Sequence, residues 1–132
     1  MEKDKNELRT RLTAEQYRVT QEKGTEPPFS GEYWNAKLSG NYSCICCQTD
    51  LFSSETKFDS GTGWPSFWGP LKDDLIATET DSSYGMKRVE VKCSNCDSHL
   101  GHLFDDGPKP TGLRYCLNSV SLGFKPPPDA RQ

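Results

Sequence analysis

The sequence predicts a mainly β protein, with antiparallel strands preceded by short helices and cross-linked through two cysteine pairs. Short runs rich in β-branched and aromatic residues, separated by Gly, Pro, Asp and Ser, follow Gly40, whereas the helical signals precede it. A length of 132 residues fits one domain. The apolar fraction of 33%, with 11 Gly and 9 Pro, predicts a small hydrophobic core and many turns. We therefore expect a single domain over 1–132, with extended or flexible ends at 1–11 and 125–132.

A capping box marks the start of the predicted helix. Thr13 and Gln16 are spaced so that hydroxyl and amide satisfy each other's backbone donors, which predicts a helix over 14–23. Gly24, which tolerates a left-handed backbone, and Pro27 beyond it would end that helix. The predicted strands are 41–46, 75–80, 87–92 and 119–124.

Charge and hydropathy exclude two classes of partner. A net charge of −3 with interspersed signs lacks the basic stripe that nucleic acid binding requires. No apolar stretch is long enough to span a membrane, and Met1–Asn6 are charged and polar rather than signal-like. We expect a soluble monomer of the cytoplasm or an organelle, with any targeting segment lying outside this sequence.

Four of the six cysteines form two C-x-x-C pairs, and these predict a structural zinc site. The pairs are Cys44 with Cys47 and Cys93 with Cys96. Two intervening residues let a turn aim both sulfurs at one ion, and four thiolates complete a tetrahedral shell with no open position for catalysis. The alternative is disulfides or free buried thiols, and Cys46 beside Cys47 leaves the ligand set open.

Cys116 stands outside these pairs and is the candidate nucleophile. It follows Arg114, whose positive charge favours the reactive thiolate. A lone cysteine is, however, more often a small buried core residue. The sequence around it has to decide between the two interpretations.

Three ordered motifs carry a resemblance to a known family. They are Lys57-Phe58-Asp59-Ser60-Gly61-Thr62-Gly63-Trp64-Pro65-Ser66-Phe67, Ser98-His99-Leu100-Gly101-His102-Leu103-Phe104-Asp105-Asp106-Gly107-Pro108 and Arg114-Tyr115-Cys116-Leu117-Asn118-Ser119. Together with Gly24-Thr25-Glu26-Pro27-Pro28-Phe29 and both cysteine pairs, they closely resemble the methionine-R-sulfoxide reductase B family over about 12–124.

The resemblance implies a fold of two antiparallel sheets with N-terminal helices, and it assigns roles to particular residues. Cys116 matches the family's catalytic cysteine, and Trp64 matches the residue that shapes the pocket for the substrate's methyl group. The surrounding polar site is carried over by motif alone: His99, His102, Asp106, Arg114 and Asn118. The residues Asp59, Phe67 and Phe104 are interpreted as structural.

The chemistry that the resemblance implies suits these residue types. A sulfoxide sulfur becomes electrophilic when its oxygen is protonated or strongly hydrogen-bonded, so His99 and His102 are candidate donors for attack by Cys116. Attack releases methionine and leaves Cys116 as a sulfenic acid. Asp106 is expected to hold an imidazole tautomer, while Arg114 and Asn118 favour the thiolate or position water. In an unrecognised sequence, two histidines three apart are more often surface or metal-binding residues.

The sequence departs from the family pattern at the recycling thiol. Many members carry a cysteine at the position of Thr62, and others near the Pro-Pro-Phe segment, where this chain has Ser30. Two routes remain. Cys46 could form a disulfide with the oxidised Cys116, or an external thiol such as thioredoxin could reduce the sulfenic acid directly. We favour the external thiol. The substrate is expected to be methionine-R-sulfoxide in proteins, with the free amino acid left open.

Two other functions compete with the reductase interpretation. A non-catalytic zinc-ribbon module would bind a partner through Trp34, Trp64 and Trp68, but it leaves Cys116 unexplained. A zinc hydrolase needs an open metal position, and two histidines supply too few ligands for one. Trp64 would ordinarily be a core aromatic, although Gly61 and Gly63 indicate a turn that exposes its ring.

Overall fold

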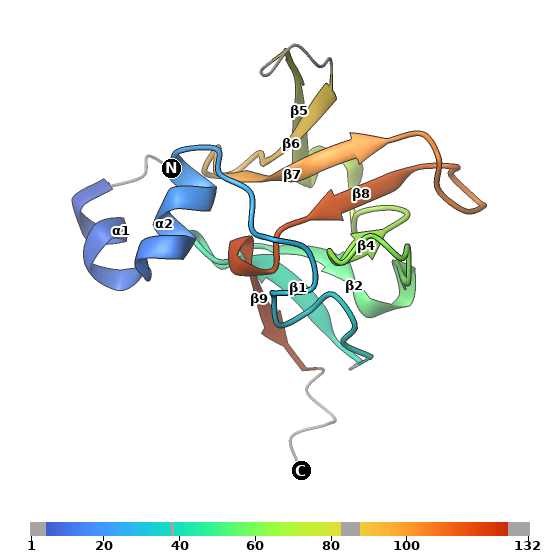
Figure 1. The fold of residues 1–132 in the computed structure, drawn as a ribbon, viewed down its shortest axis with the longest axis horizontal. Helices are drawn as coiled ribbons and strands as arrows, with labels where there is room; N and C mark the ends of the chain where they lie inside the picture. Colours follow the sequence, from blue (N-terminus) through green and yellow to red (C-terminus); the bar gives the residue numbers. More distant parts are fainter. Residues whose placement is uncertain (1–4, 38, 83–87, 127–132) are drawn as a thin grey trace.

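The computed structural model describes residues 5–37, 39–82 and 88–126, and it contains two antiparallel β-sheets beside two short helices (Figure 1). The predicted fold class is therefore confirmed, including the cluster of four cysteines described below. Among the described residues, no helix is long and apolar enough to cross a membrane.

The N-terminal helices are α1 (Lys5–Arg11) and α2 (Ala14–Gln21). The predicted capping box is present: Thr13 N–H donates to Gln16 Oε1 at 2.8 Å, and Gln16 N–H donates to Thr13 Oγ1 at 3.1 Å. Residues 5–11 are thus helical, where we had expected an extended or flexible segment over 1–11.

The end of α2 also differs from the prediction. The left-handed residue is Lys23, with φ 57°, rather than Gly24, whose N–H still donates to the Arg18 carbonyl at 3.2 Å. The Lys23 ammonium lies 3.5 Å from the buried carboxylate of Glu90. A lysine therefore occupies a backbone conformation that is uncommon for a residue with a Cβ.

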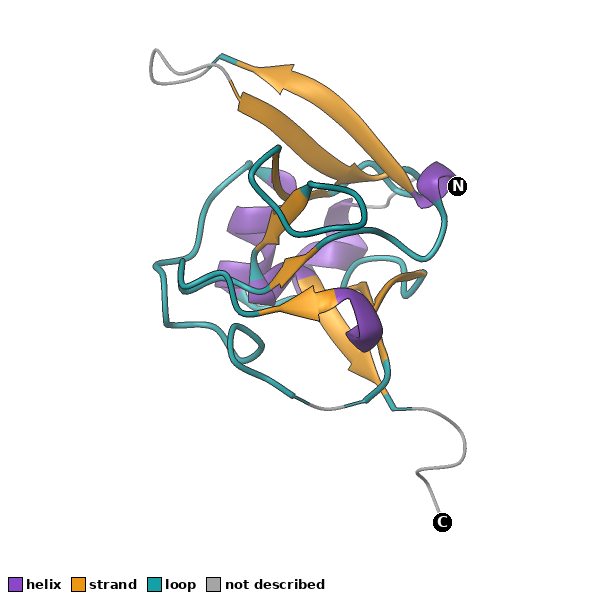
Figure 2. Cartoon of the chain, turned by 90° about the vertical axis from the view of Figure 1, so that its right-hand side faces the viewer, coloured by secondary structure: helices purple, strands orange, loops and turns teal. Residues whose placement is uncertain are grey.

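Each sheet includes one pair of strands that are distant in sequence. Figure 2 shows the strands of both sheets in orange. The three-stranded sheet has the order β2–β1–β9, and the six-stranded sheet has the order β3–β4–β8–β7–β6–β5. The first sheet comprises β1 (Asn41–Cys44), β2 (Asp50–Ser53) and β9 (Leu122–Lys125). The second comprises β3 (Lys57–Phe58), β4 (Ser66–Phe67), β5 (Ile76–Asp81), β6 (Arg88–Cys93), β7 (His99–Phe104) and β8 (Arg114–Leu117).

Three of the predicted strands overlap β1, β5 and β6 closely, and the fourth is displaced. The run 119–124 begins as a 3-10 turn over Ser119–Ser121, and only β9 is extended. The carboxylate of Glu26 accepts the Val120 N–H at 3.0 Å and so satisfies a donor of this turn. The predicted Lys87 and the tail 127–132 lie outside the described residues.

A cluster of aromatic rings holds the two sheets together. Phe52 of β2 stacks on Phe67 of β4 with centroids 4.7 Å apart, and Tyr42 of β1 meets Phe67 edge-on at 5.2 Å. Tyr115 of β8 lies 5.6 Å from Phe52. Phe67 is therefore structural, as predicted, and these rings bury much of the apolar area that stabilises the domain.

The alternation of side chains along β8 separates this core from a polar face. Tyr115 pairs with Phe67 of β4 and points to the core, so the next residue, Cys116, points to the opposite face. Cys116 pairs with Ser66 of β4 and with His102 of β7, which in turn pairs with Glu90 of β6. One polar row thus crosses four neighbouring strands.

The close approach of β7 to β8 requires a glycine beside this row. A Cβ on Gly101 would overlap the carbonyl oxygen of Cys116 and lie 2.8 Å from the Cα of Leu117. Both obstacles are backbone atoms, so no flexible side chain can move aside. We expect Gly101→Ala to lower the free energy of unfolding in urea by about 3 kcal/mol.

The matched control is Gly69→Ala, because a Cβ there meets nothing within 4 Å. We expect it to change the unfolding free energy by less than about 1 kcal/mol. Equal effects of the two substitutions would contradict the assigned backbone contact between β7 and β8.

Candidate active site and cysteine cluster

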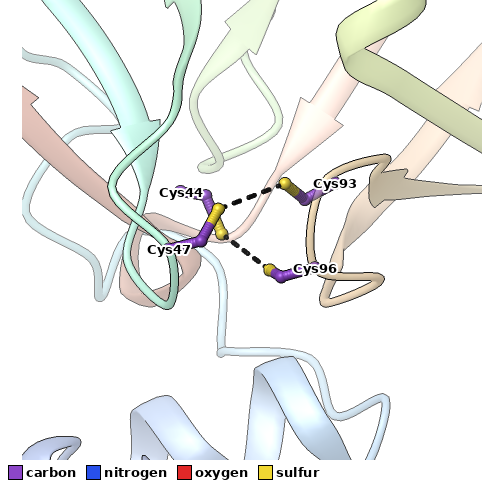
Figure 3. A group of neighbouring side chains, drawn as sticks. All are labelled: Cys44, Cys47, Cys93 and Cys96. Atoms are coloured by element: carbon purple, nitrogen blue, oxygen red, sulfur yellow. Dashed lines mark hydrogen bonds between the residues drawn. The ribbon is translucent and has the colours of Figure 1, made fainter. Parts of the chain in front are cut away.

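Four cysteines meet where β1 approaches the turn between β6 and β7. The Sγ atoms of Cys44, Cys47, Cys93 and Cys96 all lie within 4.8 Å of one another. Figure 3 marks two contacts with dashed lines, Cys44 with Cys96 and Cys47 with Cys93, each with the sulfurs 3.6 Å apart. Both distances are too long for a disulfide bond. The two C-x-x-C turns therefore converge on one point, as predicted.

The two turns have the same backbone construction. In the first, Gln48 N–H donates to the Cys44 carbonyl at 2.8 Å, and in the second, Asp97 N–H donates to the Cys93 carbonyl at 2.7 Å. Gln48 and Asp97, each directly after the second cysteine, have left-handed backbones with φ 68° and 65°. This repeated geometry aims both sulfurs of each turn toward a shared centre.

The cluster fits a tetrahedral metal ion. Zinc–sulfur bonds of about 2.3 Å place neighbouring sulfurs about 3.8 Å apart in a tetrahedron, close to the observed spacing. Hydrogen bonding with Cys44 lowers the pKa of Cys47 to about 3 and that of Cys93 to about 4. Hydrogen bonding with Cys46 and with the other three cysteines raises the pKa of Cys44. Four thiols so close together require a cation if all are to be thiolates.

Cys46 is not one of the four. Its side chain is buried, and its sulfur accepts a hydrogen bond from the Gln21 amide at 3.4 Å. Among the described residues, the sulfurs that lie close enough together to hold one metal ion are therefore those of Cys44, Cys47, Cys93 and Cys96, without that of Cys46.

Cys116 lies in a separate pocket of about 180 Å³ on the polar face of the six-stranded sheet. Trp64 and Thr62 contribute from the turn before β4, His102 and Phe104 from β7, and Arg114 from β8. The remaining lining residues are Thr25, Arg88, Gly101, Leu117 and Asn118. Of the site residues predicted from sequence, Cys116, Trp64, His102, Arg114 and Asn118 are thus brought together.

The Cys116 thiol experiences opposing influences. Burial raises its pKa above the ordinary range, while the charge of Arg114 and hydrogen bonds with Thr62 and Ser66 lower it. The effect of burial is the larger one, so without substrate the Cys116 thiol is predominantly protonated at neutral pH. Arg114 favours the thiolate as the sequence predicted, but it does not outweigh desolvation.

The walls of the pocket are fixed through Glu26. Its backbone carbonyl accepts the Trp64 indole N–H at 2.9 Å, and its backbone N–H donates to Asn118 Oδ1 at 3.0 Å. The Asn118 amide also donates to the Leu100 carbonyl at 3.2 Å. Both the oxygen and the nitrogen of the Asn118 side chain are therefore hydrogen-bonded to the backbone. These two bonds anchor the segment after Cys116.

The two predicted histidines occupy different depths. His102 lines the pocket, whereas His99 lies behind it, with the ring centroids 5.5 Å apart in an edge-on contact. His99 is only 3% exposed, and its Nδ1 lies 2.7 Å from the carboxylate of Glu90. Burial lowers the pKa of His99 despite this carboxylate, so its imidazole is mainly neutral at pH 7.

Asp106 does not hold an imidazole, contrary to our expectation. Its carboxylate accepts two hydrogen bonds from the Arg114 guanidinium, at 2.8 and 3.2 Å, and it lies outside the pocket lining. The partner of an imidazole is Glu90 instead. His99 is the first residue of β7, whereas Asp106 lies beyond its other end, so a strand separates the two side chains.

Phe104 is a pocket residue that we had interpreted as structural. It lines the pocket, and the Arg114 guanidinium lies 4.3 Å from the centre of its ring. The signal was present in the sequence, because His102 and Phe104 are two residues apart on one strand and so share a face. The turn at Gly61 and Gly63, with φ 75° and 89°, leaves Trp64 partly exposed as expected.

A partly exposed cysteine that faces an arginine and a histidine in a small pocket is typical of a cysteine-dependent enzyme. The four-cysteine cluster is distinct from that pocket. Trp34 and Trp68 are half-buried rather than freely exposed, and they are absent from the lining of the Cys116 pocket.

Comparison with known proteins identifies the family. Residues 12–126 match the SelR domain. The peptide methionine sulfoxide reductase MsrB of Synechococcus sp. (strain RCC307) is 58% identical over 125 residues, which cover 95% of this chain and 92% of the relative. The MsrB of Thioalkalivibrio sulfidiphilus (strain HL-EbGR7) is 60% identical over 118 residues, covering 89% and 86% respectively. The chain therefore belongs to the SelR domain family of methionine sulfoxide reductases B.

The opposing influences on Cys116 generate a test. Arg114→Gln removes the positive charge that lowers the pKa of this thiol. We expect iodoacetamide at pH 8 to alkylate Cys116 up to about tenfold more slowly in the variant, because each unit of pKa changes the thiolate fraction by about tenfold. Mass spectrometry of the Cys116 peptide measures the rate.

Arg18→Gln is the matched control, since Arg18 makes a similar two-pronged contact with Glu15 but lies on α2. It should leave the alkylation rate unchanged. An Arg114→Gln protein that alkylates as fast as the wild type would show that Arg114 has no influence on the thiol.

Proposed function

We propose that this chain reduces the R epimer of methionine sulfoxide to methionine, with Cys116 as the nucleophile and a cysteine sulfenic acid as the intermediate. The family assigns the enzyme class, a peptide methionine sulfoxide reductase, and the epimer and mechanism are our proposals. The observation that carries them is the Cys116 pocket, where a thiol, an indole ring and an imidazole face one small cavity.

The size of the pocket favours a side chain over a whole small molecule. Its volume of about 180 Å³ is below the range of about 300–1,000 Å³ that is typical of pockets enclosing a complete ligand. A methionine sulfoxide side chain enters from a polypeptide, and the Trp64 and Phe104 rings contact its methyl group. Methionine-R-sulfoxide in proteins is therefore the proposed substrate, and the free amino acid is accommodated without additional contacts.

The reaction needs a nucleophile on the sulfur and a proton on the oxygen. Cys116 sulfur attacks the sulfoxide sulfur, and His102, directly or through water, supplies the proton that the oxygen receives. The oxygen ends on Cys116 as a sulfenic acid, so the cysteine sulfur loses two electrons and the methionine sulfur gains them. Arg114 stabilises the thiolate as it forms, while Asn118 and Glu26 keep the pocket walls in place.

Recycling is proposed to use an external thiol, thioredoxin or another small thiol carrier. Thr62, whose hydroxyl contacts Cys116, has no sulfur to form a disulfide. Cys46 belongs to the turn that bears Cys44 and Cys47, and it is not among the residues lining the pocket. The first thiol of the reductant attacks the sulfenic sulfur and releases water, and the second thiol then frees Cys116.

The cysteine cluster is proposed to hold one structural Zn²⁺ per chain through Cys44, Cys47, Cys93 and Cys96. When bound there, the ion cross-links the two turns and has no open coordination position for a substrate. The cluster joins β1 of one sheet to the end of β6 in the other. Its role is therefore to fix the relative position of the two sheets rather than to take part in the reaction.

The proposed reaction predicts epimer selectivity that depends on one thiol. With dithiothreitol as reductant, the wild type should convert the R epimer and leave the S epimer, because Trp64 and His102 present different groups to the methyl and oxygen substituents. Cys116→Ser should have no detectable turnover at unchanged metal content. Chromatography that separates the two epimers of the remaining sulfoxide, together with quantification of the methionine formed, measures both results.

Cys46→Ser is the control that also tests recycling. It should retain turnover with both dithiothreitol and thioredoxin, since an external thiol reduces Cys116 directly. Loss of the thioredoxin-dependent rate alone would make Cys46 the resolving thiol. A folded wild type that converts neither epimer would contradict the proposed function.

The metal proposal predicts a difference between neighbouring cysteines. Cys47→Ser should reduce bound zinc well below one per chain and lower the free energy of unfolding by several kcal/mol, because binding free energy at such a site is folding free energy. Cys46→Ser, one residue away, should retain one zinc. Atomic absorption and thermal unfolding measure the two quantities, and equal zinc content in both variants would refute the assignment.

A further inference from the structure

Glu90 is a buried carboxylate that the proposed mechanism does not use. It lies in the interior of β6 and is 1% exposed. One oxygen is 2.7 Å from His99 Nδ1, and the other is 3.5 Å from Lys23 Nζ. A buried carboxylate is costly unless it is paired, so its retention at this position calls for a reason beyond packing.

A β-bulge brings Glu90 and both histidines to the same face. Residues three apart on a regular strand point to opposite faces, as His99 and His102 would. Between β6 and β7, however, the register passes from Val91 opposite Gly101 to Lys92 opposite His99, so that Leu100 is the extra residue. Such bulges redirect side chains beside functional sites. Here the bulge turns His99 back toward His102.

Glu90, His99 and His102 form a series of side-chain contacts that leads from the core to the pocket. Glu90 contacts His99, the His99 ring meets the His102 ring edge-on at 5.5 Å, and His102 lines the pocket that contains Cys116. His102 is also the cross-strand partner of both Glu90 and Cys116. Within the sheet, only His102 lies between Glu90 and Cys116. Along the side-chain contacts, His99 and His102 lie between them.

The carboxylate determines the state of the His99 ring. A carboxylate accepts from Nδ1–H, so the neutral ring carries its proton on Nδ1 and leaves Nε2 as an acceptor. His99 Nε2 is buried and has no hydrogen-bond partner among the described residues. It is thus an acceptor able to take up a proton, with the negative charge of Glu90 at the other side of the ring to stabilise the cation.

We propose that Glu90 is a positioning residue for the reductase reaction: its carboxylate fixes the tautomer of His99 and lets the histidine pair hold the proton that the sulfoxide oxygen receives. The inference rests on the proposed function. The proton passes from the pair to the oxygen during attack by Cys116 and is replaced from solvent after the product leaves.

The charged groups around the pair act in both directions. Glu90 favours protonation of His99, whereas burial, His102 and the ammonium of Lys23 oppose it. Lys92, the next residue on this face of β6, is paired with Glu79 and Asp97 and so contributes little net charge. Arg88, on the same face of β6, and Arg114 of β8 place positive charge beside the pocket that His102 lines. Glu90 is therefore the group whose removal should most reduce proton retention by the pair.

The decisive variant is Glu90→Gln, which preserves shape and a hydrogen-bond acceptor but removes the charge. We expect kcat for the R epimer to fall by roughly 10- to 100-fold near pH 8, with KM changed less than about twofold. The loss of kcat with rising pH should begin at lower pH than in the wild type, because the imidazolium is less stable without the carboxylate. Glu90→Asp should restore part of kcat and of the pH profile.

Glu79→Gln is the matched control. Glu79 faces Glu90 across the β5–β6 ladder but is exposed and paired with Lys92. It should leave both kcat and the pH profile unchanged. If Glu90→Gln lowers kcat equally at every pH, or not at all, the proposal is overturned.

Imidazole nitrogen NMR of the zinc-loaded protein separates this proposal from the proposed function. It should show the His99 proton on Nδ1 in the wild type, with a shifted resonance in Glu90→Gln. An Nε2-protonated His99 in the wild type would overturn the assigned role of Glu90 even if the enzyme is active. Failure to reduce either epimer would instead count against the reductase mechanism itself.

Discussion

The alternation of side chains along β8 is the constraint on which the rest of the structure depends. Tyr115 enters the aromatic core that joins the two sheets, and this forces its neighbour Cys116 to the opposite face. A slip of one residue would bury the thiol among Phe52 and Phe67 and expose the tyrosine. The same packing that stabilises the fold therefore places the reactive sulfur at the pocket.

Local chemistry in the sequence predicted much of the architecture. The capping box at Thr13, the two C-x-x-C turns and the separate status of Cys116 each depend on residues close together in the chain, so their spacing carries the information. The same holds for the turn around Trp64, where glycines supply the left-handed backbone.

Features that depend on strand register could not be predicted in this way. The partnership of Glu90 with His99 requires both the pairing of β6 with β7 and the bulge at Leu100, and neither leaves a local pattern. Asp106 illustrates the converse: it is near the histidines in sequence, yet the direction of β7 carries it to Arg114. Lys23, in place of the expected Gly24, adopts the left-handed conformation where its ammonium reaches Glu90.

Polar groups near the pocket are buried at a cost to stability. Glu26, Glu90, His99 and Asn118 are each no more than 3% exposed, and in the described structure Glu26 Oε2 and His99 Nε2 have no hydrogen-bond partner. Apolar residues at these positions would pack without that penalty. The arrangement is consistent with a pocket whose geometry matters more than the stability of the surrounding sheet.

The pairing of β9 with β1 constrains the order in which the molecule assembles. Hairpins such as β5–β6 and β6–β7 close short loops, whereas β9 follows all the other strands and must return to β1 to complete the three-stranded sheet. Contacts between distant residues carry the larger loop-closure entropy and form late. During synthesis, the second cysteine turn emerges well before β9, so the cluster can close while the smaller sheet still lacks one edge.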